Sequence, residues 1–243
     1  MEKLLWLVYS HTEYADVLEI TLKRIKKYCP SVKVALCIND IDYIRNKYKD
    51  YNFHALYQYD NSATYGERMR SVLYQIPEKY IIYNHEHDIL VDYIDMNILS
   101  MFVNTMETER IDQLRLSVSG IESPIFDKEL SIYPIKGPYH LSLITSLWNR
   151  ESLLSIATEF HSHSFRCFEC EPIQEFVSKM KNYYLSSTKD IKYINEGHYF
   201  SYYFPTAHCT NYGKWHTSSP TTQAFILNMV NEYGIELSKR GEN

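Results

Sequence analysis

The stretch KYIIYNHEHDILVDYID, residues 79–95, carries four consecutive ionisable side chains between two apolar runs. The four residues are His85, Glu86, His87 and Asp88. Carboxylate oxygens are the ligands that Mg²⁺ and Mn²⁺ prefer, and imidazole nitrogens also suit Zn²⁺. Side chains of these types, placed next to one another, therefore predict a metal-binding site.

The spacing of the two carboxylates favours a hard divalent cation. In an extended segment successive side chains point to opposite faces, so Glu86 and Asp88 would share one face. Mn²⁺ or Mg²⁺ bound there would leave positions for a diphosphate and would neutralise the charge of a departing nucleoside diphosphate. Two alternatives stay open: a strand-end turn with solvated charges, and a metal-dependent hydrolase that binds Zn²⁺ with the His85-Glu86-His87-Asp88 cluster.

Alternating strand and helix patterns position this cluster. Continuous apolar runs predict buried strands, and periodic apolar stripes predict the helices between them. The expected strands are residues 3–10, 32–38, 54–60 and 79–84, and the expected helices are residues 12–29, 42–51 and 62–78. Strands and helices that alternate through short connections indicate an α/β fold, with a mostly parallel central sheet and helices on both faces.

Ligands of such a sheet bind outside the carboxyl ends of its strands. The ionisable cluster follows the fourth expected strand and so lies at this edge. Tyr9, Ser10 and His11 end the first strand. Asn39 and Asp40 end the second strand. We expect these five residues to contact a ligand, because tyrosine offers a face for stacking and the polar side chains can form hydrogen bonds.

The second half of the chain mixes helix and strand patterns. Helices are expected at residues 96–111, 171–185 and 221–237, strands at 113–118 and 198–209, and a strand that passes into a helix at 143–160. Asn149 is the expected cap of that last helix. A long polar connection covers residues 121–142. The sequence contains no clear linker or low-complexity tract, so we expect a single domain over residues 1–243.

The composition excludes several classes of protein. A hydrophobic fraction of 45% disfavours disorder, and a net charge of −5 gives no electrostatic footprint for nucleic acid. No apolar run reaches the roughly 18 residues of a transmembrane helix. Five cysteines, an odd number, argue against a disulfide framework and favour a cytoplasmic protein. Cys167 and Cys170 form a single C-x-x-C, which is too small a ligand set to predict structural zinc.

Several stretches resemble glycosyltransferases of the GT-A type. Glu86-His87-Asp88, after a fourth strand, is similar to the D-x-D motif of that family, with Glu in place of the first Asp. Residues 142–160 and the stretch FRCFECE, residues 165–171, resemble a region of small bacterial and viral GT-A proteins. Residues 211–241, with their Gly-Lys-Trp and closing Arg-Gly, resemble the C-terminal ending of that group. The likeness spans nearly the whole chain and implies a GT-A-like fold.

The resemblance implies a metal-dependent, inverting glycosyltransferase. Residues 1–95 would form the nucleotide-binding half and residues 96–243 the acceptor-binding half. The enzyme would use Mn²⁺ or Mg²⁺ and move a sugar from a nucleoside-diphosphate sugar, with a UDP-sugar favoured, to a glycan or other hydroxyl acceptor. Glu169 matches the position of the family's catalytic base, and Glu171 is the neighbouring alternative. A non-catalytic nucleotide-sugar binder with the same fold is a further alternative.

The same resemblance implies the remaining site residues. Asp88 matches the firmer metal ligand of the motif and Glu86 the other acid, and His208 would complete the metal site. Arg68, on the helix before the motif, would face the nucleotide, although a solvated helix arginine fits equally well. Lys214, in Gly-Lys-Trp, would contact the diphosphate. The candidate nucleotide-binding set is Tyr9, Ser10, His11, Asn39, Asp40, Arg68, His87 and Lys214.

Overall fold

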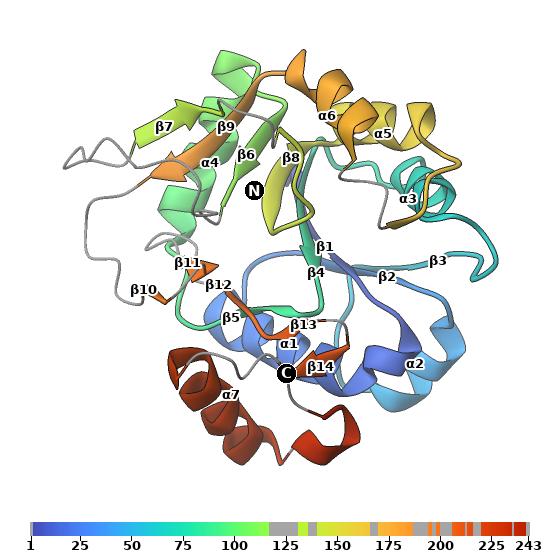
Figure 1. Cartoon of the computed structure of the whole chain (residues 1–243), viewed down its shortest axis with the longest axis vertical. Coiled ribbons are helices and arrows are strands. Elements are labelled where there is room, and N and C mark those ends of the chain that lie inside the picture. The colour runs from blue at the N-terminus through green and yellow to red at the C-terminus, as the bar shows by residue number, and fades with distance from the viewer. Residues whose placement is uncertain are drawn as a thin grey trace.

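The computed structural model describes residues 2–116, 131–135, 140–165, 170–186, 194–195, 198–199, 206–211, 213–215, 220–234 and 236–241. An eight-stranded sheet in the order β3-β2-β1-β4-β8-β6-β9-β7 forms its centre (Figure 1). Its strands are β1 (Leu4–Tyr9), β2 (Val34–Ile38), β3 (Ala55–Gln58), β4 (Tyr80–His85), β6 (Gln113–Arg115), β7 (Ser131–Pro134), β8 (Ser146–Asn149) and β9 (Asn182–Ser186). The α-helices are α1 (Ala15–Tyr28), α2 (Ile41–Lys47), α3 (Tyr65–Leu73), α4 (Met96–Glu109), α5 (Arg150–Glu159), α6 (Glu171–Ser178) and α7 (Pro220–Tyr233).

The pairing of the strands confirms the predicted mostly parallel α/β sheet. β3, β2, β1 and β4 pair in parallel, joined by α1, α2 and α3. β8 then pairs antiparallel with both β4 and β6. β6 is parallel to β9, and β7 closes the sheet antiparallel to β9. Parallel pairings therefore outnumber antiparallel ones by four to three.

Helices cover both faces of the sheet, as predicted. The side chains of β1 alternate between two cores, because successive residues of a strand point to opposite faces. Leu4, Trp6 and Val8 pack with residues of α1 and α4. Leu5 and Leu7 pack with residues of α3, α5 and α6. Burial on both faces explains why this strand is a continuous apolar run in the sequence.

Short polar side chains cap the starts of α3, α2 and α5. At the start of α3, the Thr64 hydroxyl accepts a hydrogen bond from the Glu67 amide, and the Glu67 carboxylate accepts one from the Thr64 amide at 2.9 Å. This reciprocal pair is a capping box. Asp40 caps α2. Asn149 caps α5 as predicted, by accepting from the Glu151 amide at 3.0 Å.

The second half departs from its predicted elements in two places. The stretch expected as a polar connection, residues 121–142, contains the strand β7, which pairs with β9. The helix expected over residues 171–185 ends at Ser178, and residues 182–186 form β9 instead. β9 lies between β6 and β7 in the sheet, so both of its edges are paired with other strands. Long-range pairing thus overrides the local helical pattern.

The C-terminal part of the chain returns to the end of β4. β5 (Asp88–Leu90) follows β4 after a two-residue turn, and β12 (Thr206–His208) pairs with it antiparallel. α7 packs on α1 and β5 through a third core, and Figure 1 shows α7 beside α1. The remaining elements are η1 (Thr12–Tyr14), β10 (Ile194–Asn195), β11 (His198–Tyr199), β13 (Thr210–Asn211), β14 (Lys214–Trp215) and η3 (Leu237–Lys239). The strand expected at 198–209 corresponds to β11 and β12, and residues 200–205 fall outside the described part.

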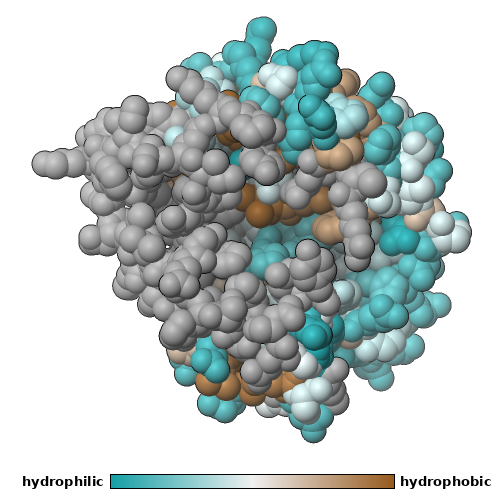
Figure 2. All heavy atoms as spheres, viewed as in Figure 1, coloured by the Kyte–Doolittle hydropathy of each residue, from teal (hydrophilic) through white to brown (hydrophobic). Residues whose placement is uncertain are grey.

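The surface of the molecule is uneven in polarity. Figure 2 shows hydrophobic residues (brown) near the centre of the face drawn in Figure 1 and a largely hydrophilic surface (teal) to their right. Within the described ranges, no helix has both the length and the apolar character needed to cross a membrane.

Candidate active site

A pocket of about 710 Å³ opens at the carboxyl ends of β1 and β4. Its walls include the end of β1, the turn after β4, and residues near the C-terminus such as His208 and Gly213. Leu143 and Phe165 line it from the second half of the chain. Its volume is typical of a small-molecule site, and it lies at the sheet edge where α/β proteins bind ligands.

The turn between β4 and β5 decides which ionisable side chains meet. Glu86 and His87 form this turn, so the chain is not extended there. The prediction that Glu86 and Asp88 share a strand face is therefore wrong. Ligand atoms instead form two groups, each lying within 4.8 Å of one another: His85, Glu86 and His87 in one group, and His87, Asp88 and His208 in the other.

The group of His87, Asp88 and His208 joins segments that lie 120 residues apart. β5 and β12 pair in a register that places Asp88 opposite His208. Nδ1 of His208 donates to Oδ1 of Asp88 at 3.0 Å, and the hydroxyl of Thr145 donates to Oδ2 at 3.1 Å. Asp88 is buried, whereas His87 and His208 are partly exposed and line the pocket. The register of two short strands thus assembles the group.

The electrostatics of the group keep Asp88 ionised. Burial raises the pKa of its carboxyl, but the hydrogen bond from His208 and the charge of His87 outweigh burial and lower the pKa to about 2. For His87, burial lowers the pKa, but the nearby carboxylates of Glu86, 3.7 Å from Nδ1, and of Asp88 outweigh burial and raise the pKa. A charged carboxylate beside two imidazoles can bind a divalent cation, which would displace any proton on the ligating nitrogens.

His85 forms part of an aromatic wall of the pocket. Its Nε2 lies 3.0 Å from the hydroxyl of Tyr83, which bonds in turn to the hydroxyl of Tyr65. Its ring stacks with His87 at 5.2 Å between centroids and meets the ring of Phe165 edge-on at 5.3 Å. Burial, together with the charge of His87, lowers the pKa of His85 to about 4. His85 is therefore a neutral imidazole that can take part in hydrogen bonds.

Phe165 reaches the pocket because the segment after α5 packs directly on α3. The amide of Gly66 donates to the carbonyl of His163 at 3.2 Å. A Cβ atom at Gly66 would lie 2.4 Å from the carbonyl oxygen of Phe160. The absence of a side chain at this glycine therefore sets the close approach of the two segments.

The three residues predicted at the end of the first strand lie in the pocket. Tyr9, Ser10 and His11 all line it. The hydroxyl of Tyr9 accepts a hydrogen bond from Nη1 of Arg68 at 3.4 Å, and its ring stacks on Tyr59 at 5.3 Å between centroids. The guanidinium of Arg68 also lies over the Tyr59 ring, 4.8 Å from its centroid. Arg68 is not one of the lining residues, and it supports Tyr9 from behind.

Asn39 and Asp40 also lie behind the pocket wall. Asn39 accepts from the Thr12 amide at 2.9 Å and donates to the Thr12 hydroxyl at 3.1 Å. Asp40 accepts from the Tyr43 amide at 2.9 Å, as the cap of α2. Neither residue lines the pocket. Asn39 thus holds the loop that carries His11, and Asp40 stabilises a helix start.

Two of the remaining predicted residues, Lys214 and Glu171, are not among the described residues that line the pocket. Lys214 is exposed on β14, next to Gly213 of the pocket wall. Glu171 is exposed in the first turn of α6 and does not line the pocket. Glu169, the predicted base, lies outside the described residues.

Several residues of the site are not predicted from the sequence, among them Thr145 and Phe165. Thr145 supports Asp88, and the signal for it is a small polar residue inside the apolar run that leads into β8. Phe165 lines the pocket from a segment with no periodic pattern, so its place depends on the packing of that segment at Gly66.

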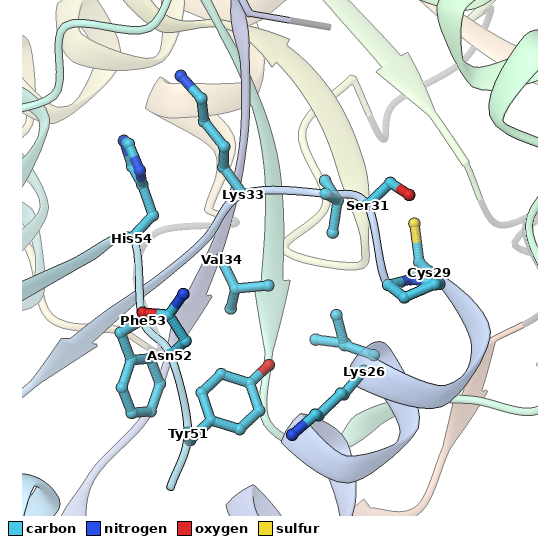
Figure 3. A pocket seen from close by; sticks show the side chains of 12 residues that line it. Lys26, Cys29, Ser31, Lys33, Val34, Tyr51, Asn52, Phe53 and His54 are labelled. Atoms are coloured by element: carbon cyan, nitrogen blue, oxygen red, sulfur yellow. The ribbon is translucent and has the colours of Figure 1, made fainter. Parts of the chain in front are cut away.

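A second pocket of about 530 Å³ lies at the opposite edge of the sheet, where β2 and β3 begin and α1 ends (Figure 3). Nζ of Lys33 and Nε2 of His54 lie 3.3 Å and 3.1 Å from the same oxygen of Glu78. Lys26 belongs to the last turn of α1, where a positive charge offsets the helix dipole. The structure thus gives each basic side chain of this pocket a role within the protein.

Comparisons with known proteins give weak likenesses only. No protein-family model matches the sequence, and no curated protein matches it. S. aureus TarS has a TM-score of 0.47 and 15% identity, over 74% of this chain and 36% of that chain. S. aureus TarS 1-349 in complex with UDP has a TM-score of 0.48 and 13% identity, over 82% of this chain and 60% of that chain. A cytidylyltransferase from Leptospira borgpetersenii serovar Hardjo-bovis has a TM-score of 0.48 and 14% identity, over 74% of each chain. Similarity at this level assigns neither a family nor an activity.

Proposed function

We propose that the protein is a metal-dependent glycosyltransferase that moves a sugar, with inversion, from a nucleoside-diphosphate sugar to a hydroxyl of a carbohydrate acceptor. A UDP-sugar is the favoured donor. The observation that carries the proposal is the group of His87, Asp88 and His208 in a pocket at the carboxyl edge of the sheet. A GT-A-like single domain, with residues 1–95 for the nucleotide and 96–243 for the acceptor, is part of the proposal.

The chemistry of the ligand group fits Mn²⁺ better than Mg²⁺. Asp88 offers a carboxylate, and His87 and His208 offer imidazole nitrogens. Mg²⁺ prefers oxygen ligands, whereas nitrogen ligands suit transition metals. Glu86 lies 3.7 Å from Nδ1 of His87 and would hold that imidazole in place. The bound metal would supply positive charge to the diphosphate oxygens.

The nucleotide would occupy the side of the pocket formed after β1. Ser10 and His11 offer polar groups there, and Tyr14 offers a ring for stacking. Arg68 would support this wall through Tyr9. Lys214, exposed on β14, would approach the diphosphate from the C-terminal side.

The transfer step needs a base near the acceptor. Glu169 is the proposed base, and Glu171 is the alternative. The carboxylate would take the proton of the acceptor hydroxyl while the acceptor oxygen forms a bond to the anomeric carbon. The bond from that carbon to the diphosphate oxygen would break, and its electron pair would leave with the nucleoside diphosphate.

A panel of nucleoside-diphosphate sugars, assayed with Mn²⁺ and glycan acceptors, tests this proposal. We expect consumption of a UDP-sugar with transfer of its sugar. Glu169→Gln should abolish transfer and leave donor binding unchanged in calorimetry; loss of transfer in Glu171→Gln but not in Glu169→Gln would instead assign the base to Glu171. Absence of binding by every nucleoside diphosphate would refute the proposal. Binding without turnover in the unmodified protein would instead indicate a non-catalytic nucleotide-sugar binder.

A metal-dependent hydrolase is the second candidate, because His85, Glu86 and His87 form a further group of ligand atoms. His85 is buried, and its Nε2 bonds to Tyr83, so Nδ1 is the nitrogen left for a metal. Zinc that copurifies with the protein, together with no binding of nucleoside diphosphates, would favour this candidate.

A further inference from the structure

Arg240 connects two walls of the candidate pocket that come from opposite ends of the chain. Tyr14 and Gly213 both line the pocket. Nη1 of Arg240 donates to the Gly213 carbonyl at 3.4 Å, and Nε donates to Oδ2 of Asp16 at 2.7 Å. The guanidinium lies over the ring of Tyr14, 4.5 Å from its centroid. One side chain thus contacts both walls and the first turn of α1.

The geometry of these contacts needs a guanidinium. Nη2 of Arg240 bonds to Oδ1 of Asp16 and to the carbonyl of Glu13, so both oxygens of Asp16 are engaged. Two N–H···O bonds to one carboxylate fix the orientation of the group, and a lysine cannot reproduce them. Only 10% of the Arg240 side chain is exposed, so water screens the pair weakly.

The segment that carries Arg240 is itself anchored to the protein. Leu237 of η3 packs against the third core, and the amide of Trp215 donates to the carbonyl of Gly241 at 3.1 Å. Trp215 follows Gly213 on the same hairpin and is fully buried. The hairpin and residues 237–241 are therefore linked, and Arg240 connects both to the turn before α1.

The two walls stand almost in contact where Arg240 joins them. A Cβ atom at Gly213 would lie 3.3 Å from the hydroxyl of Tyr14, and the φ of this glycine is +78°. A small displacement of either wall would therefore change the shape of the pocket at this point.

We infer that Arg240 is a positioning residue of the candidate site, which holds Tyr14 and Gly213 in the arrangement that binds the nucleoside-diphosphate part of the donor. The identity of that ligand rests on the proposed function. Arg240 does not line the pocket, so it acts through the two residues that it holds.

A second ion pair in the C-terminal part offers a matched control. Glu232 of α7 lies 2.7 Å from Nη2 of Arg24 and 2.9 Å from Nζ of Lys27, both on α1. This contact also ties the end of the chain to the first helix, but none of its residues lines the pocket. Loss of Glu232 should loosen the C-terminal part without moving Tyr14.

Calorimetric titration of the full chain with UDP and Mn²⁺ tests the inference. Arg240→Gln should raise the Kd for UDP by on the order of tenfold. Arg240→Lys should raise it less, because lysine keeps the positive charge. Glu232→Gln should lower the Tm and keep the Kd within about twofold of the unmodified protein. An unchanged Kd in Arg240→Gln, or an equal rise in Glu232→Gln, would overturn the inference.

Hydrogen–deuterium exchange separates this inference from the proposed function. If the unmodified protein binds no UDP, the proposed donor is wrong, and exchange of the amides at residues 11–16 and 210–215 decides the role of Arg240. Faster exchange there in Arg240→Gln than in Glu232→Gln supports it. Equal exchange in the two variants contradicts it.

Discussion

The two pockets lie at opposite edges of the same sheet, and each contains a histidine beside a buried acid. At the carboxyl edge, Asp88 pairs with His208, and His87 adds a third ligand atom within 4.8 Å. At the amino edge, Glu78 binds both His54 and Lys33 through one oxygen. The first acid belongs to a group of side chains that could hold a metal ion, whereas the second is in contact with two basic side chains of the protein. The comparison indicates that a buried acid belongs to a ligand-binding site only where the side chains around it can also bind a metal ion or another ligand.

The positions in the fold of the residues that contact Glu78 and Asp88 explain this difference. The amino-edge contacts join Lys33, His54 and Glu78, which lie just before β2, β3 and β4. The carboxyl-edge contacts join β5 with β12 and with Thr145 before β8. Loops from several strands meet at that edge in α/β proteins, so ligand groups assemble there.

Replacement of the two histidines should give the largest contrast between the edges. His208→Ala removes a proposed ligand and should weaken Mn²⁺ binding by more than the roughly 100-fold that loss of an outer-shell partner costs. His54→Ala should leave Mn²⁺ binding unchanged, because His54 belongs to the other pocket. Titration of each variant with Mn²⁺, followed by electron paramagnetic resonance, measures both. Equal losses in the two variants would remove the distinction between the edges.

The buried His85 should make stability depend on pH. Its pKa is about 4 in the folded protein, against an ordinary value of 6.5. As the pH falls from 6.5 to 4, the unfolded chain takes up a proton that the folded protein does not, so stability falls by up to about 3 kcal/mol. His85→Gln should flatten the curve of unfolding free energy over this window, as measured by urea denaturation. The same slope in both proteins would show that His85 does not carry this effect.

The close contact at Gly66 offers a smaller test of how the site is positioned. Gly66→Ala should destabilise the protein by about 1–3 kcal/mol, because its Cβ would clash with the carbonyl of Phe160. Ser71→Ala, at an exposed position of the same helix, is the control and should have little effect. Thermal denaturation measures both variants. Equal stability would mean that the segment after α5 moves freely away from α3.

The smallest effect is expected at the amino edge. Lys26→Ala should change stability by no more than about 0.5 kcal/mol and should not change UDP affinity. Lys26 is exposed, and it lies in the pocket of Figure 3, at the opposite edge from the proposed nucleotide. Loss of UDP binding in this variant would indicate that UDP binds at the amino edge, contrary to the proposal. Calorimetry with UDP provides the measurement.

The parallel half of the fold is predictable from the sequence for a physical reason. β1, β2 and β4 are buried on both faces, so each is a continuous apolar run that ends at polar residues. The predicted helix at residues 171–185 fails at its end, because β9 is stabilised by pairing with β6 and β7. The local sequence pattern of residues 171–185 carries no information about the pairing of β9 with β6 and β7.

The site is predictable as single residues and not as an arrangement. Asp88 and His208 are both expected metal ligands, but their contact depends on the register of two three-residue strands. The turn at residues 86–87 breaks the strand alternation on which the predicted Glu86 and Asp88 pair rests. Turn geometry of this kind follows from the contacts around it, which a single sequence does not reveal.

Calorimetric titration with UDP, in Mn²⁺ and in EDTA, tests whether Asp88, His87 and His208 bind a metal ion that the binding of a nucleoside diphosphate requires. We expect UDP to bind tightly only with Mn²⁺, and Asp88→Asn to lose this dependence. Equal UDP affinity with and without Mn²⁺, or a dependence on Mn²⁺ that persists in Asp88→Asn, would contradict the account.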